Sequence, residues 1–261
     1  MNLSNNRLCG VWVEYDGTRK GNYITEGINA IADALRVHGA LTSVELRGNQ
    51  LGDNGWGAIF AAICGSKDSK ITSLDASSEN IGSVGGHAVA AMVAVTGALT
   101  SIDLSKNNLT DYGENMTGVK ELAAALGVNS GLMALDLSFN DLKDEGVSAV
   151  CEAILSNKET KLASLSMVET RIGPVGAKSV AAMVAVTGAL TSLDLSNNSL
   201  CEVNAYRGTY AAEGITAIAD ALCVNGALTE CNLKCNPCIG EEGEALIRKA
   251  MQGKAGLKLR I

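Results

Sequence analysis

The stretch LTSLDLSNNSL at residues 190–200 decides the fold. Leu193 and Leu195 stand at alternate positions, so they point to the same face of a short strand, which ends before Asn198. Clean copies of this pattern begin at Leu41, Leu99 and Leu132, looser copies begin at Ile71, Leu162 and Leu228, and a truncated copy contains Leu3, Asn6 and Leu8. The chain is therefore built from one repeated unit.

Each unit contains a helix as well as a strand. Successive copies start 28 to 38 residues apart. Between them lie segments such as residues 213–222, where Ile215, Ile218 and Leu222 recur at helical spacing. One strand–helix unit cannot bury its apolar face alone, so we expect the units to stack and their strands to form a parallel sheet.

This pattern resembles the leucine-rich-repeat family, specifically its ribonuclease-inhibitor-like subclass, over essentially the whole chain. The resemblance implies an α/β solenoid shaped as a horseshoe, with a parallel β-sheet on the concave face and helices on the convex face. It also implies a single domain over residues 1–261, made of about eight repeats of which the first is partial.

An asparagine recurs where the strands end, and in the family it is buried and bonds neighbouring backbone groups. It stands at Asn6, Asn49, Asn107, Asn140, Asn198 and Asn236. Two repeats carry Glu79 and Thr170 at this position instead. Because a buried glutamate is costly, we expect local distortion there, with Asn80 substituting for Glu79.

A longer period is superimposed on the repeats. Residues 83–105 match residues 174–196 at an offset of 91, with 18 of 23 residues identical. The array is therefore built from blocks of three repeats. The long repeat of each block, near the N-terminus, at Leu99 and at Leu190, carries extra residues between strand and helix.

The first candidate binding surface is a column of carboxylates on the concave face. Strands in a sheet lie about 4.8 Å apart, so such carboxylates repel one another and raise one another's pKa values. A partner with a basic surface would relieve this repulsion. The alternative is that the column is repeat consensus and its carboxylates are solvated and screened. Its members are Glu45, Asp75, Asp103, Asp136 and Asp194, with Ser166 and Asn232 in the remaining repeats.

The inserted segments of the long repeats form the second candidate surface. All five tyrosines lie there, and exposed Tyr, Trp and Arg are common binding anchors. The alternative is that the tyrosines pack locally and hold the long loops in place. The candidate binding residues are Trp12, Tyr15, Tyr112, Tyr206, Arg207 and Tyr210, and the fifth tyrosine is Tyr23.

The convex helices of the short repeats form the third candidate surface. Residues 88–95 contain no polar side chain, and the alignment of the repeats places Ala91, Ala94, Ala182 and Ala185 on the outward side. A helix that is apolar all round usually has neighbours on more than one side. The alternative is that exposed alanine is tolerated because it is the best helix former.

Composition limits the function classes. The chain of 261 residues has 28 acidic and 21 basic residues, a net charge of −7, which argues against a nucleic-acid partner. The N-terminus lacks the features of a secretory signal, and no apolar run is long enough for membrane insertion. Eight cysteines without a signal are expected to be reduced thiols in the cytoplasm.

No catalytic, metal or cofactor site is expected. His38 and His87 have no nucleophile pattern beside them, and there is no phosphate-binding glycine motif. The cluster Cys231, Cys235 and Cys238 lacks a fourth zinc ligand. Two of its members replace core leucines while Cys235 points outward, so the three cannot converge on one ion.

The resulting prediction is a non-enzymatic scaffold for protein–protein recognition. Two alternatives stay open: a subunit of a larger complex that docks by its convex helices, and a GTPase-activating protein of the Ran type, which the subclass also contains. The first repeat starts in mid-strand at Met1 without a polar cap. We therefore expect either a fragment of a longer array or an edge covered by a partner.

Overall fold

The computed structural model describes residues 1–201, 211–237, 239–252, 254 and 256–261. Three-residue strands alternate with helices of 10 to 14 residues. None of the described helices is long and apolar enough to cross a membrane. In chain order the elements are β1 (Val11–Val13), β2 (Arg19–Gly21), α1 (Glu26–Val37), β3 (Ser43–Glu45), α2 (Gly52–Gly65), β4 (Ser73–Asp75), α3 (Ser83–Val95), β5 (Ser101–Asp103), α4 (Thr117–Leu126), β6 (Ala134–Asp136), α5 (Lys143–Ser156), β7 (Ser164–Ser166), α6 (Pro174–Val186), β8 (Ser192–Asp194), α7 (Glu213–Val224), β9 (Glu230–Asn232), α8 (Gly240–Ala250) and β10 (Lys258–Arg260).

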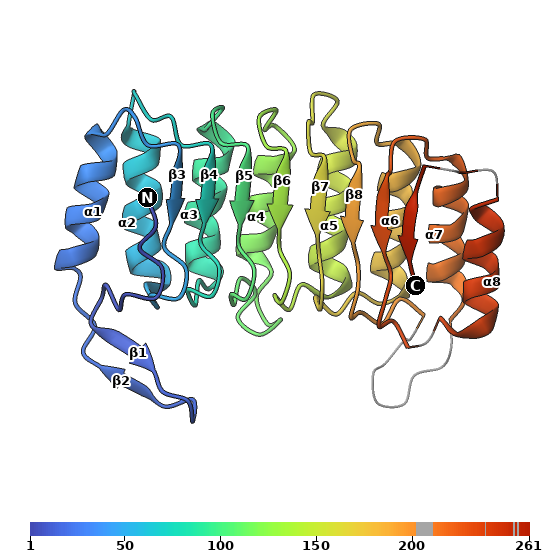
Figure 1. The fold of residues 1–261 in the computed structure, drawn as a ribbon, viewed down its shortest axis with the longest axis horizontal. Coiled ribbons are helices and arrows are strands. Elements are labelled where there is room, and N and C mark those ends of the chain that lie inside the picture. The colour runs from blue at the N-terminus through green and yellow to red at the C-terminus, as the bar shows by residue number, and fades with distance from the viewer. Residues whose placement is uncertain (202–210, 238, 253, 255) are drawn as a thin grey trace.

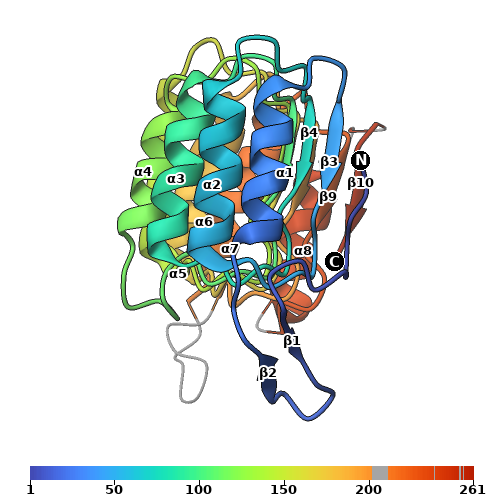
Figure 2. The same ribbon diagram turned by 90° about the vertical axis from the view of Figure 1, so that its left-hand side faces the viewer.

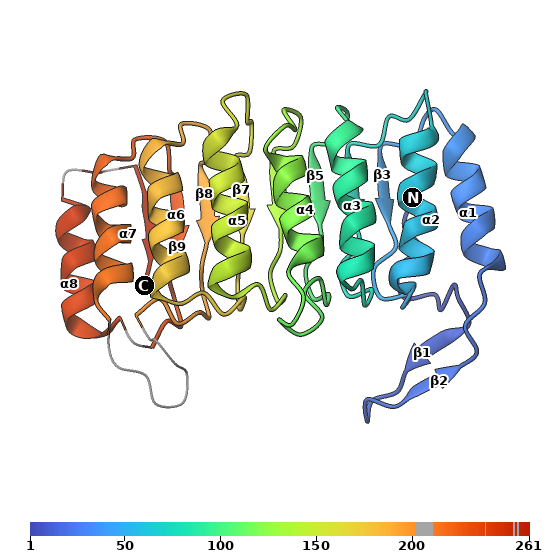
Figure 3. The same cartoon turned by 180° about the vertical axis from the view of Figure 1, so that it is seen from behind.

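The described strands β3 to β10 form one parallel sheet in sequence order, and the helices cover one side of it (Figures 1 and 3). Neighbouring strands lie about 4.8 Å apart, whereas packed helices need about 8–10 Å. Each repeat therefore turns the stack, so the sheet is concave and the helices are convex (Figure 2). Outside the sheet, β1 and β2 form an antiparallel hairpin at the N-terminal end.

The core lies between the sheet and the helices, as the leucine pattern predicted. The middle residue of each inner strand points inward, and Leu135 and Leu193 are each only 2% exposed. The helical positions Ile215, Ile218 and Leu222 close the core from the other side and are buried. The parallel α/β solenoid expected from the repeats is therefore the fold that forms.

The recurrent asparagines join each repeat to the one before it. Oδ1 of Asn198 accepts hydrogen bonds from the N–H groups of Thr170 and Ile172, each at 3.0 Å. Its Nδ2 donates to the carbonyl oxygens of Leu195 at 3.0 Å and Met167 at 2.9 Å. Asn49 and Asn107 bond in the same way. One side chain thus holds two successive turns together.

Glu79 takes the place of an asparagine without distorting the repeat, so the expected distortion is wrong. Its side chain is fully buried. Oε1 accepts the N–H of Asn49 at 2.6 Å, and Oε2 accepts the N–H of Leu51 at 2.8 Å. Strand β4 keeps its register with β3 and β5, and Asn80 is exposed and substitutes for nothing. Burial raises the pKa of the Glu79 carboxyl group to about 7, although the two amides lower it.

Thr170 fills the equivalent position 91 residues later in a different way. Its side chain is buried, and its Oγ1 donates to the carbonyl oxygen of Met167 at 2.9 Å. In other repeats the Nδ2 group of the asparagine donates to the carbonyl three residues earlier, as Asn198 does to Leu195. The Thr170 hydroxyl therefore replaces the donor of the asparagine side chain. The carboxylate of Glu79 replaces the acceptor half.

Two helices receive their N-terminal caps from the preceding repeat. Helices α3 and α6 follow Gly82 and Gly173 and have no cap bond from an N-cap side chain of their own. Oδ1 of Asp53, in α2, accepts the N–H groups of Gly82 at 2.6 Å and Gly85 at 3.0 Å. Asp144, 91 residues later, makes the same two bonds to α6 at 2.7 and 2.9 Å. A Cβ at residue 85 would lie 2.5 Å from this Asp53 oxygen, which explains the glycine.

We predict that Asp144→Ala lowers the free energy of unfolding by about 1–2 kcal/mol, because two amides of α6 lose a charged cap. Urea denaturation measures the change. The control is Asp33→Ala, because Asp33 is exposed and only pairs with Arg36 at 3.5 Å, and its loss should cost less than about 0.5 kcal/mol. Equal losses in the two variants would contradict the capping role.

Candidate functional site

The predicted column of carboxylates is assembled on the concave face of the sheet. In each strand from β3 to β9 the middle residue is buried, so the third residue points away from the helices. These third residues pair in register from strand to strand, and the row continues through Ser166, Asn232 and Arg260. We call the acidic members the acid ladder: Glu45, Asp75, Asp103, Asp136 and Asp194.

Each aspartate of the acid ladder also closes the turn that follows its strand. Oδ1 of Asp103 accepts the N–H of Ser105 at 2.8 Å, and Oδ1 of Asp136 accepts that of Ser138 at 2.8 Å. Asp75 and Asp194 make the corresponding bonds to Ser77 and Ser196. The repeat consensus thus has a structural reason, because one carboxylate oxygen serves the turn. The second oxygen is left for other donors, as when that of Asp194 accepts from Asn232 Nδ2 at 2.9 Å.

Asp103 stands at the electrostatic centre of the acid ladder. Burial raises the pKa of its carboxyl group, and the neighbouring charges of Asp136 and Asp75 raise it further, against the lowering effect of the bonds from Ser105. Asp194 occupies the same place in the next block but is flanked by Ser166 and Asn232. The like-charge repulsion is therefore concentrated in the middle of the sheet.

We predict that Asp103→Asn stabilises the protein at pH 7.5 by about 0.2–1 kcal/mol, the size of a cross-strand charge pair. The folded chain holds the Asp103 proton more tightly than the unfolded chain. The wild type therefore loses stability as the pH rises from the pKa of Asp103 in the unfolded chain to its higher pKa in the folded chain. The asparagine removes this loss and keeps an oxygen for Ser105. Thermal melts should converge towards about pH 4, near the pKa of an unfolded aspartate.

Asp194→Asn is the matched control, because no carboxylate flanks Asp194 in the sheet. It should give no gain in stability at pH 7.5. An equal gain in both variants would show that the repulsion within the acid ladder is not the cause.

The first inserted segment forms the β1–β2 hairpin, which projects from the edge where the strands end (Figure 1). Trp12 is half-buried, and the guanidinium carbon of Arg7 lies 4.7 Å from its ring centroid. Tyr15 is fully exposed. Tyr23, at the foot of the hairpin, is half-buried and its hydroxyl donates to the carbonyl oxygen of Leu51 at 2.7 Å. Local packing thus holds for Tyr23, whereas Tyr15 is accessible to a partner.

The second inserted segment displays Tyr112, which is 76% exposed. Asp111, Tyr112 and Gly113 have φ values of 48°, 59° and 82°, and the first two are costly for residues with a side chain. The segment is held by a bond from Tyr112 N–H to Asn108 Oδ1 at 2.6 Å and by Lys143 Nζ, which donates to the Gly113 carbonyl at 2.9 Å. Tyr112 is therefore presented on an ordered turn. The remaining predicted loop residues, Tyr206, Arg207 and Tyr210, lie outside the described residues.

We predict that Tyr23→Phe loosens the hairpin, because its half-buried foot loses the hydrogen bond to the Leu51 carbonyl. A loss of about 1 kcal/mol corresponds to a roughly fivefold rise in local opening. Limited trypsin digestion after Arg19 and Lys20, both exposed in β2, measures this opening. Tyr15→Phe is the control and should leave the cleavage rate unchanged. Equal rates in both variants would contradict the tethering role.

The convex alanines point outward as the alignment predicted. Ala91, Ala94 and Ala182 are exposed and Ala185 is half-exposed. However, α3 packs between α2 and α4, and α6 packs between α5 and α7. The apolar flanks of these two helices are thus accounted for by packing within the repeat stack. The outermost alanines and the valines near the helix ends, Val84, Val95, Val175 and Val186, remain exposed.

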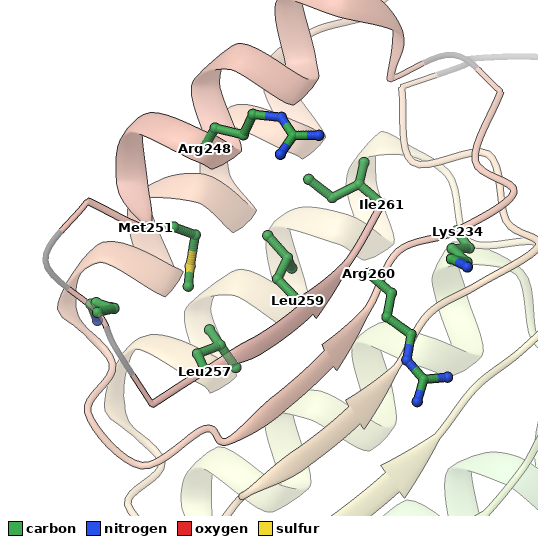
Figure 4. Close-up of a pocket in the computed structure, with 8 residues that line it drawn as sticks. Lys234, Arg248, Met251, Leu257, Leu259, Arg260 and Ile261 are labelled. Carbon is green, nitrogen blue, oxygen red and sulfur yellow. The ribbon is translucent and has the colours of Figure 1, made fainter.

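A hollow of about 700 Å³ lies between α8 and β10 (Figure 4). Its walls combine apolar side chains such as Leu257 and Leu259 with the cations of Lys234, Arg248 and Arg260. Two of these cations are already paired, Arg260 with Glu230 at 2.9 Å and Arg248 with Glu244 at 3.2 Å. Helix α8 and strand β10, which border this hollow, lie at the opposite end of the sheet from the hairpin (Figure 1).

The cysteine cluster does not come together as a metal site in the described part of the chain. Cys231 is buried within β9, whereas Cys235 is exposed in the following turn, and Cys238 lies outside the described residues. Among the described residues, no group of three or more His, Cys, Asp or Glu side chains is placed to hold a metal ion.

Comparison with known families identifies the repeat. Two models, described as "Leucine Rich repeat" and "Leucine Rich Repeat", match residues 41–60 and 128–151 and residues 189–206. These three segments each contain the strand and turn of one repeat, and the stacked strand–helix units are those of this architecture. The chain is a leucine-rich-repeat protein. No curated protein matches its sequence.

Solved structures with similar folds are distant in sequence. The tropomodulin C-terminal domain of Caenorhabditis elegans is 12% identical over 87% of this chain and 99% of its own, with a TM-score of 0.47. Leiomodin-1 actin-binding site 2 is 15% identical over 65% of this chain and 90% of its own, with a TM-score of 0.47. An internalin of Listeria monocytogenes is 15% identical over 85% of this chain and 54% of its own, with a TM-score of 0.48.

Proposed function

We propose that this leucine-rich-repeat protein is a recognition module that binds a protein partner with a basic surface through the acid ladder. The observation that carries the proposal is the in-register row of carboxylates with Asp103 between two like charges. A partner's lysine or arginine side chains would remove this repulsion on binding. Complementary charge also speeds association and excludes acidic partners.

The acid ladder suits recognition because it is rigid before any partner arrives. The bonds from Ser105 and Ser138 hold the carboxylates of Asp103 and Asp136 in one orientation. Little side-chain entropy is then lost on binding. The exposed Tyr15 and Tyr112 extend the proposed surface to the edge where the strands end, and aromatic anchors of this kind add specificity.

The proposal includes several narrower points. We place the chain in the ribonuclease-inhibitor-like subclass because each of the strands β3 to β9 is followed by a helix of 10 to 14 residues. We treat residues 1–261 as a single domain of about eight repeats with a non-enzymatic role. We also propose a cytoplasmic location, where the cysteine thiols would stay reduced, and no nucleic-acid partner, in keeping with the net charge of −7.

The test is an affinity capture from native lysate with quantitative mass spectrometry. The variant Asp103→Asn/Asp136→Asn/Asp194→Asn removes three charges and keeps an oxygen for each turn, so it tests charge without unfolding the turns. The control variant, Ala91→Glu/Ala182→Glu, alters only exposed convex positions. We predict that the wild type and the convex variant capture the same partner in similar amounts. The triple variant should capture at least about tenfold less of this partner.

Two further outcomes discriminate between the surfaces. Rising salt should weaken capture by the wild type, because exposed charges are screened within about 8–10 Å at physiological ionic strength. Loss of capture by the convex variant alone would reject the acid ladder in favour of docking through the helices. Undiminished capture by the triple variant would reject charge recognition, and Tyr15→Ala/Tyr112→Ala would then test the loops.

A further inference from the structure

The turn formed by residues 49–51 is held by side chains from two directions. On one side its amides donate to the carboxylate of Glu79, as described above. On the other side its carbonyls accept hydrogen bonds from the foot of the hairpin. The single S–H of Cys9 is shared between the carbonyls of Asn49 and Gln50, whose oxygens lie 3.2 and 3.3 Å from Sγ, and Tyr23 donates to the carbonyl of Leu51. The turn therefore links the buried carboxyl group to the hairpin.

The equivalent turn of the next block, residues 140–142, shows a different bonding pattern. Thr170 stands in the place of Glu79, and its hydroxyl group donates to the Met167 carbonyl. The N–H of Leu142 then bonds to the carbonyl oxygen of Asn140 within its own turn, at 2.8 Å. Thr110 takes the place of Cys9 and donates only to the Asp141 carbonyl, at 2.9 Å. One chain thus contains both arrangements of the same turn.

We propose that Glu79 is a proton-operated clamp on the hairpin. When it is ionised, the carboxylate holds both amides of the turn and so keeps the carbonyls of the turn in place for Cys9 and Tyr23. When it is protonated, the turn changes to the arrangement seen at residues 140–142. The hairpin that carries Trp12 and Tyr15 then loses part of its anchor. This inference does not depend on the acid ladder as a binding surface.

The exchange of hydrogen bonds follows from the chemistry of a carboxyl group. One oxygen takes up a proton from solvent and becomes a donor, and the other oxygen remains an acceptor. The O–H finds an acceptor in the carbonyl of Ala76, three residues earlier, as the Thr170 hydroxyl does in Met167. When Oε2 carries this proton, it turns away from the N–H of Leu51, while Oε1 keeps the N–H of Asn49. The released N–H of Leu51 bonds to the Asn49 carbonyl and displaces the thiol of Cys9 there.

The surroundings of Glu79 favour uptake of a proton. The titratable groups that face it are Asp75 of β4, whose charge disfavours a second anion, and Cys9 and Tyr23 of the hairpin foot. Arg19 of β2 acts on the last two. The neutral indole of Trp56 is buried against the same core, and its N–H favours the ionised form. Burial dominates these effects, which brings the exchange into the neutral range.

Local order and global stability respond to pH in opposite directions. The folded-state pKa of Glu79 lies above the unfolded value, so its contribution to stability is fully present at low pH and is lost as the pH rises towards the folded value. The clamp, in contrast, tightens as the pH rises. A measurement of the turn itself therefore separates the proposal from a general change in stability.

Amide hydrogen exchange by NMR of the full chain, at pH 5.5 and 8.5, tests the clamp. The protection factor of the Leu51 amide should be about tenfold lower at pH 5.5, because its charge-assisted bond to the carboxylate is exchanged for a weaker neutral bond within the turn. That of Ile24, whose N–H bonds to the Cys9 carbonyl at 2.9 Å, should fall with it. The Leu142 amide is the internal control and should keep the same protection factor at both pH values.

Glu79→Gln replaces the carboxyl group by an amide that is neutral at both pH values. The Leu51 amide of this variant should therefore have a low protection factor at pH 5.5 and at pH 8.5. Thr170→Ser is the matched control and should behave as the wild type. If Glu79→Gln fails to fold, the ¹³C carboxyl shift of Glu79 in the wild type replaces it, and its midpoint should coincide with that of the Leu51 and Ile24 amides. A carboxyl group that stays ionised down to pH 5.5, or a constant Leu51 or Ile24 protection factor, would overturn the proposal.

Discussion

The turn after each strand contains backbone groups that its own repeat leaves without partners, and the rest of the structure depends on how the next repeat satisfies them. A buried amide or carbonyl without a partner costs free energy comparable to a lost hydrogen bond. The asparagines such as Asn198 supply an acceptor and a donor across the repeat boundary. At the opposite edge, Asn157 Nδ2 donates to the carbonyl of Leu126 at the end of the preceding helix. Repeats therefore stack in one register, because another register would leave these groups unpaired.

The same constraint shapes the proposed binding surface. The aspartates of the acid ladder close the turns after β4, β5, β6 and β8 through one oxygen, so the turn gives a structural reason for their recurrence. Their alignment then follows from the register of the sheet and accumulates charge on the concave face. Structural and recognition roles are thus carried by different oxygens of one side chain. Asp103 and Asp194 show the consequence, since both make the same bond to the turn but have different neighbours in the adjacent strands.

The 91-residue period places matched sites in different surroundings. Asp53 and Asp144 keep one role, because both cap a helix that begins after glycine. Glu79 and Thr170 diverge, because one provides the acceptors and the other the donor that an asparagine combines. The divergence is tolerated because an amide of the turn that loses its side-chain acceptor can bond within the turn instead. The Leu142 N–H does so when it donates to the Asn140 carbonyl. The chain therefore contains two variants of the contact between a turn and the next repeat. The variant beneath the hairpin contains an ionisable group, the carboxyl group of Glu79.

The sequence by itself determined the strand–helix unit, the parallel sheet, its register and the column of carboxylates, because side-chain alternation and a repeat spacing are properties of the chain. Tertiary structure alone decided which inserted tyrosine packs and which is exposed, since Tyr23 meets the Leu51 carbonyl 28 residues away. It also decided that Glu79 is accommodated, because its two donors, Asn49 and Leu51, come from the preceding repeat. The apolar flanks of α3 and α6 are explained in the same way, by neighbouring helices that no local pattern reveals. Periodic interactions can be read along the chain, whereas the fate of a single polar group depends on what another repeat brings to it.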